Sequence, residues 1–73
     1  MVQRATSIGE RTGSRIRLLR DRRNWSQKQL ADFSDLSRWS INQAESGQAD
    51  LRLSTLEKIA LALEVRPSEL LAD

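Results

Sequence analysis

Hydrophobic residues recur at helical spacing along most of the chain. Ile16 and Leu19 fall on one face with Arg20, and this pattern predicts a helix from Ser14 to near Asn24. A stronger amphipathic pattern follows in the second half of the chain, at four positions: Leu56, Ile59, Ala60 and Leu63. Runs of alternating β-branched residues do not occur, so the pattern predicts an all-α fold.

Capping signals divide this pattern into further short helices. Ser26 with Gln29, and Ser54 with Glu57, have the spacing of a capping box, in which two side chains satisfy free N–H groups at a helix start. They predict a short helix from Ser26 and a longer one from Ser54. Pro67 suits the first position of a last short helix. Together with the segment described next, these signals predict five helices.

The segment SRWSINQAESG, Ser37 to Gly47, predicts a helix with a wide polar face. Ser37 can cap its start, and Gly47 can close its end in the left-handed conformation. Only Ile41 and Ala44 provide an apolar inner face. A short joint containing Leu36 connects this helix to the one before it. Such a connection favours two helices that cross at a steep angle, the helix-turn-helix geometry.

Composition limits the chemistry that the chain can perform. It has 73 residues with no cysteine and no histidine, so it lacks thiol ligands and the commonest general base. It also lacks a glycine-rich phosphate loop and clustered carboxylates. We therefore expect no enzyme, no metal site, no cofactor and no small-molecule ligand. No apolar run approaches the length of a membrane span, so we expect no membrane partner and a cytoplasmic protein.

Charge is distributed unevenly along the chain. Residues 1–23 contain seven arginines and two acidic residues, whereas residues 24–73 contain five basic and eight acidic residues. Arginine suits bidentate contact with phosphates and bases, so the basic end favours an anionic partner; a solvated basic helix is the alternative. Residues 1–12 show no periodicity and predict a flexible N-terminal arm, followed by one domain over residues 13–73.

Two segments carry a resemblance to a known family. The sequence SQKQLADFSDLSRWSINQAESG, followed by LRLSTLEKIALAL, resembles the Cro/C1-type (XRE-like, lambda-repressor-like) helix-turn-helix domain. The resemblance extends from Gly13 to Leu71, at matching positions that include Ser26, Gln27, Leu30, Ala31, Ser37, Ile41, Glu45, Gly47, Leu53, Thr55 and Leu56. It implies a compact five-helix domain that binds double-stranded DNA, with helix two across the backbone and helix three in the major groove.

The chain departs from the family pattern at several positions. Asp35 stands where the family usually has glycine, and aspartate is among the few residues that tolerate a positive φ. Ala44 replaces a larger apolar residue, which thins the core beside helix three. We expect Trp25 to pack in the core, where the family prefers leucine.

The polar face of helix three supplies candidate base-reading residues. With Ile41 and Ala44 turned inward, four side chains remain outside or on the flanks: Arg38, Trp39, Asn42 and Gln43. Arginine can bind the O6 and N7 atoms of guanine, and glutamine or asparagine can bind adenine. The resemblance places Arg38, Trp39 and Gln43 at base-reading positions. The alternative is an ordinary solvated face of an amphipathic helix.

The resemblance also suggests residues for the DNA backbone and for stability. Six side chains are candidates for phosphate contacts: Gln27, Ser40, Ser46, Gln48, Arg52 and Arg15. Arg4 and Arg11 of the expected arm are further candidates. Arg20 and Glu45 occupy positions that can form a partly buried ion pair between helices one and three, and we interpret this pair as structural.

Two features leave alternatives open. Trp39 either packs against Leu36 or the second helix, or exposes its indole to thymine methyls and sugars, or contacts another protein. The function that we expect is a sequence-specific transcriptional regulator, a repressor that binds a partly palindromic operator as a homodimer through Leu70 and Leu71. The alternative is a protein-interaction module, such as an antitoxin or adaptor, that uses Phe33 and Trp39.

Overall fold

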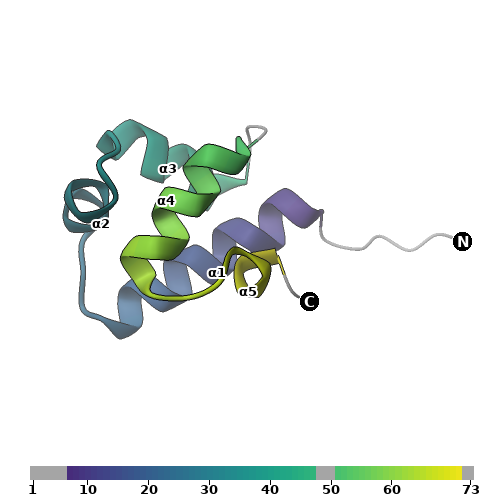
Figure 1. The fold of residues 1–73 in the computed structure, drawn as a ribbon, viewed down its shortest axis with the longest axis horizontal. Helices are drawn as coiled ribbons and strands as arrows, with labels where there is room; N and C mark the ends of the chain where they lie inside the picture. The colour runs from purple at the N-terminus through teal and green to yellow at the C-terminus, as the bar shows by residue number, and fades with distance from the viewer. Residues whose placement is uncertain (1–6, 48–50, 72–73) are drawn as a thin grey trace, which may run out of the picture.

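The computed structural model describes residues 7–47 and 51–71, and these form five α-helices and no strand. Their bounds are α1 Ile8–Arg22, α2 Gln27–Ser34, α3 Arg38–Ser46, α4 Leu53–Leu63 and α5 Pro67–Leu71. The expected all-α, five-helix fold is confirmed. In Figure 1, α2 is seen nearly along its axis while α3 runs across the view, so the two helices cross steeply.

The first helix begins earlier than the hydrophobic pattern predicts. The Ser7 hydroxyl accepts a hydrogen bond from the Glu10 N–H, and the Glu10 carboxylate accepts one from the Ser7 N–H, both at 3.1 Å. This capping box starts α1 at Ile8 instead of Ser14. Residues 7–12, which we assigned to a flexible arm, therefore belong to the folded domain. Arg4 lies outside the described residues.

Glycine at position 13 allows α1 to pack directly on α3. A Cβ atom at Gly13 would lie only 2.5 Å from the carbonyl oxygen of Glu45 and 2.6 Å from that of Ala44. No side chain fits between the two backbones there. Gly13 is therefore a helical residue at a close helix–helix contact.

The helix-turn-helix unit has the expected caps. Ser26 and Gln29 form a capping box at the start of α2, and Ser37 accepts a hydrogen bond from the Ser40 N–H at the start of α3. Asp35 takes the left-handed conformation at φ 60°, as expected of the residue that replaces the turn glycine. Gly47 closes α3 in the same region, at φ 71°.

The fourth helix corrects one prediction. It begins at Leu53, and its N-cap, Arg52, makes no side-chain capping bond. Ser54 is thus already inside the helix, so the capping box expected with Glu57 does not form. Pro67 is the first residue of α5, as predicted.

The core lies where all five helices converge. Its fully buried large side chains are Ile16, Leu30, Ile41, Ile59, Leu63 and Leu70. Leu70 is therefore unavailable for the two-fold contact that we expected of it, whereas Leu71 remains 43% exposed. Trp25 and Leu36 are half-buried and pack against the edge of the core. Among the described residues, none of the helices is long and apolar enough to cross a membrane.

Candidate nucleic-acid interface

The outer face of α3 presents the candidate base-reading side chains. Ile41 and Ala44 are buried against the core, so the opposite side of the helix faces solvent. Arg38, Trp39 and Asn42 are exposed and Gln43 is half-buried. Because α3 is only nine residues long, packing on α1 and α2 rather than intrinsic propensity holds this face in place.

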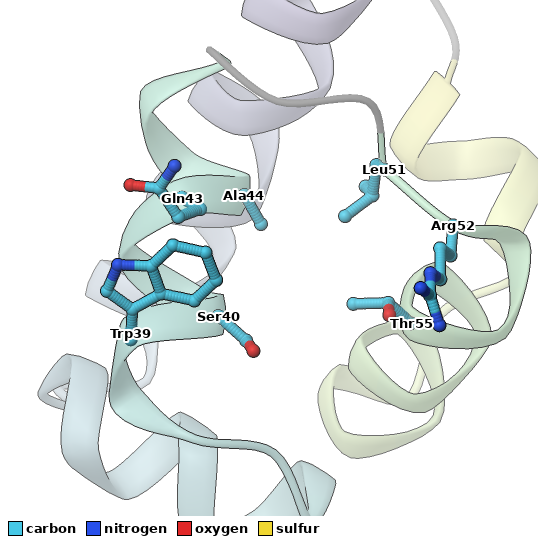
Figure 2. Close-up of a pocket in the computed structure, with 7 residues that line it drawn as sticks. All are labelled: Trp39, Ser40, Gln43, Ala44, Leu51, Arg52 and Thr55. Atoms are coloured by element: carbon cyan, nitrogen blue, oxygen red, sulfur yellow. The ribbon is translucent and has the colours of Figure 1, made fainter.

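The structure excludes one of the three alternatives for Trp39. Its side chain is 70% exposed, which excludes packing against Leu36 or the second helix. In Figure 2 the indole lies beside Gln43, along the outside of α3.

A cleft of about 330 Å³ separates this part of α3 from the start of α4. Its lining residues are Trp39, Ser40, Gln43, Ala44, Leu51, Arg52 and Thr55. Figure 2 shows the α3 residues on one wall, and Leu51, Arg52 and Thr55 on the facing wall. Two candidates for backbone contact, Ser40 and Arg52, thus lie on opposite sides of one cleft next to Trp39.

A buried ion pair joins α1 to α3 on the side away from the outer face of α3. The Arg20 Nε atom lies 2.6 Å from Glu45 Oε2, and its Nη2 atom donates to Oε1 at 3.0 Å. The two side chains are 11% and 5% exposed. Hydrogen bonding to Glu45 raises the pKa of Arg20 above its ordinary value, so the guanidinium stays charged. Its Nη1 atom also donates to the Trp25 carbonyl at 2.7 Å.

Gln27 and Asn42 connect this pair to the surface. The Gln27 amide donates to Glu45 Oε1 at 3.1 Å, and its oxygen accepts a long hydrogen bond of 3.5 Å from the Asn42 amide. We had assigned Gln27 to a phosphate and Asn42 to a base. In the free protein, both amides make contacts within the domain, and Asn42 remains exposed.

Two arginines of α1 lie on different sides of the helix, and only Arg15 is among the residues that the sequence suggests for a phosphate. Arg17 lines a recess of about 320 Å³ together with Arg20, Gln27, Asn42, Glu45 and Ser46. Arg17 lies three residues before Arg20, and this helical spacing predicts that the two side chains share one face of α1. Arg15 points to the other side of α1, where its Nη1 atom donates to the Glu69 carbonyl of α5 at 3.0 Å. Arg15 therefore lies beside α5 and not beside the candidate residues of α3.

The other candidates fall into two groups. Ser46 lies in the Arg17 recess, and its hydroxyl donates to the Gln43 carbonyl at 2.9 Å. Gln48 lies outside the described residues.

No group of His, Cys, Asp and Glu suited to a metal ion occurs in residues 7–47 and 51–71.

The exposed Phe33 belongs to a separate aromatic contact. The centroid of its ring lies 4.6 Å from that of the Trp25 ring, and the two ring planes form an angle of 34°. The guanidinium carbon of Arg23 lies 5.2 Å from the centre of the Trp25 ring. None of the residues that line the Trp39 cleft comes from α2, so Phe33 and Trp39 do not share that cleft.

The fold contains two steeply crossed helices, α2 and α3, and the second of them has a polar outer face and packs on α1 and α2. This arrangement defines a helix-turn-helix domain. The family model for helix-turn-helix domains matches residues 16–70. The chain therefore belongs to the Cro/C1-type, XRE-like helix-turn-helix family, a family of DNA-binding transcription regulators rather than enzymes.

Individual relatives agree with this assignment. The chain is 40% identical over 60 residues to the control protein C.BamHI of Bacillus amyloliquefaciens, covering 81% of this chain and 74% of that protein. It is 38% identical over 58 residues to the competence pilus inhibition repressor of Acinetobacter baylyi, covering 80% of this chain. The match spans only 53% of that repressor's own length.

Among solved structures, the restriction-modification controller protein C.AhdI of Aeromonas hydrophila superimposes with a TM-score of 0.80 at 38% identity. That match covers 84% of this chain and 92% of C.AhdI. A hypothetical transcription factor from Neisseria superimposes with a TM-score of 0.87 at 28% identity, covering 99% and 85% of the two chains.

Proposed function

We propose that this chain is a sequence-specific transcriptional regulator, acting as a repressor in the bacterial cytoplasm, that places α3 in the major groove. The observation that carries the proposal is the outer face of α3, where Arg38, Trp39 and Gln43 project from the second helix of the motif. Relatives named as a repressor and as control proteins support a regulatory role.

We further propose that the chain binds a partly palindromic operator as a homodimer. A single helix in one groove reads only a few base pairs, and such domains gain affinity by pairing. An apolar groove of about 290 Å³ offers a surface for a second copy, and three of its lining residues expose large apolar side chains: Ile8, Leu53 and Leu71. This groove replaces the buried Leu70 as the candidate two-fold contact.

Selection of bound sequences from a random DNA pool tests both proposals. We expect enrichment of an inverted repeat whose half-sites lie about 34 Å apart along the duplex, one helical turn. Sedimentation of the complex should give two chains per duplex. A pool without enrichment would refute sequence-specific binding. An enriched single half-site bound by one chain would refute the homodimer but not sequence-specific binding.

Arg38 supplies the first mutational prediction. Replacement by alanine should weaken binding to the selected site by about 1–3 kcal/mol and relax the preference at one base position, because a bidentate contact to guanine is lost. Fluorescence titration on the selected site and on single-base variants measures both effects. If binding to random DNA fell by the same factor, Arg38 would contact phosphate and not a base.

Arg17 supplies the second prediction, with Arg15 as a matched control. Arg17→Gln should weaken binding to all sequences alike and reduce the slope of log affinity against log salt by about 0.9, the change expected for one lost phosphate contact. Arg15→Gln removes the same charge from the same helix. It should leave the slope unchanged because Arg15 faces α5. Equal slopes for the two variants would show that Arg17 does not contact a phosphate.

The exposed Phe33 ring favours a second candidate function, a protein-interaction module such as an antitoxin or adaptor. Large exposed apolar side chains often mark protein contacts. A gel shift on random genomic fragments separates the two functions, since an interaction module without DNA binding would leave every fragment unshifted.

A further inference from the structure

The indole of Trp39 is largely exposed in the free protein, so packing in the core does not explain a tryptophan at this position. It stands on the first turn of α3, 70% exposed, on the face opposite Ile41 and Ala44. Tryptophan is highly buried on average, so a large apolar ring in solvent at this position points to a surface that becomes buried on binding.

The neighbours of Trp39 show which part of a bound duplex it would meet. Gln43 lies one helical turn further along the same wall of the cleft, and Arg52 lies on the facing wall (Figure 2). Gln43 can hydrogen-bond to a base edge, and Arg52 can bind a phosphate. With α3 in the major groove, Trp39 would therefore face base edges beside those that Gln43 reads.

The major groove offers few partners for an apolar ring. The exposed edges of adenine, guanine and cytosine present hydrogen-bond donors and acceptors, and the 5-methyl group of thymine is the distinct apolar group. The faces of the indole ring offer no strong hydrogen bond to a base edge. Contact with a thymine methyl would bury the ring without leaving polar groups of the base unpaired.

We propose that Trp39 is a specificity-determining residue that recognises the 5-methyl group of a thymine next to the base pair read by Gln43. The inference rests on the proposed DNA-binding function and names the base that one position of the operator requires. It replaces the alternative of a protein contact for Trp39.

Replacement of thymine by deoxyuridine tests the proposal directly, because it deletes one methyl group and leaves all hydrogen-bonding groups in place. In the selected site, each thymine is replaced singly and affinity is measured at fixed salt. One thymine position per half-site should lose about fourfold in affinity, the factor expected for burial of one methyl group. In Trp39→Ala, the same replacement should have no effect.

Leu61→Ala provides a matched control. Leu61 is 79% exposed on α4 and lines neither the Trp39 cleft nor the apolar groove, so this variant should retain the full sensitivity to deoxyuridine. Thermal melting checks that both variants remain folded, as expected for two exposed side chains.

The remaining outcomes distinguish failure of the thymine inference from failure of the proposed function. If no thymine is sensitive, or if sensitivity persists in Trp39→Ala, the thymine inference is wrong while the proposed function stands. Loss of affinity in Trp39→Ala without any sensitivity to deoxyuridine would show that Trp39 contacts another part of the duplex and would also overturn the inference. Absence of binding to every duplex by the wild-type chain would overturn the proposed function together with it.

Discussion

Replacement of Glu45 by alanine is expected to lower the free energy of unfolding by about 3 kcal/mol. Loss of one partner of a buried ion pair typically costs 3–5 kcal/mol, because the other charge stays buried without compensation. Arg20 keeps the Trp25 carbonyl at 2.7 Å and the exposed carboxylate of Asp21 at 3.3 Å, so we expect the lower end of this range. In a domain of this size, such a loss lowers Tm by about 12 °C or more.

Calorimetry with two companion variants makes this prediction specific. Asp32→Ala breaks the pair between Lys28 and Asp32, whose side chains are largely exposed, and should cost less than about 0.5 kcal/mol. The double variant Arg20→Met, Glu45→Leu should recover part of the stability, because it leaves no unpaired buried charge. A Tm for Glu45→Ala within error of wild type would show that the pair does not hold α1 to α3.

Local sequence signals predicted the helix-turn-helix unit well. Short-range capping fixes both ends of α2 and α3, and each signal lies within a few residues of the structure that it determines. Asp35 illustrates this: its left-handed conformation follows from the length of the turn and from the side chains that tolerate it. The family resemblance then supplied the hypothesis that α3 reads base pairs.

Errors arose where a residue's role depends on a distant segment. Gly13 breaks a helical pattern when considered locally, yet its role is set by the backbone of α3 about thirty residues later. Similarly, Arg15 and Arg17 have the same charge and lie two positions apart. Only the packing of α3 and α5 on different sides of α1 places Arg17 in the recess beside α3 and Arg15 against the C-terminal helix.

Trp39 shows a different limit of sequence reasoning. Helical spacing placed it on the outer face, but a ring of this size can lean toward the core from a flanking position. Its exposure depends on whether α2 and α4 leave room beside α3. In the structure, the ring lines the cleft between α3 and α4 and remains exposed.

Gly13→Ala is expected to destabilise the domain by about 3 kcal/mol, although alanine is the better helix former. In an exposed helix, this substitution would stabilise by about 1 kcal/mol. At Gly13, the added Cβ would meet two backbone oxygens at 2.5 and 2.6 Å, and backbone atoms of a packed helix cannot move aside as a flexible side chain can. We therefore expect a cost at the upper end of the range for overpacking. Denaturant unfolding followed by circular dichroism measures this loss.

Two neighbouring positions distinguish a clash from a general intolerance of α1 to substitution. Ser14→Ala, at the next and exposed residue, should be neutral or slightly stabilising. The stability of Gly9→Ala should lie between those of Gly13→Ala and Ser14→Ala, because its Cβ would lie 3.2 Å from the Gly47 carbonyl oxygen. If Gly13→Ala stabilised the domain as much as Ser14→Ala, α1 and α3 could not approach as closely as the structure places them. Since that approach also sets the position of α3, the destabilised variant should lose DNA affinity as well, with Ser14→Ala unaffected.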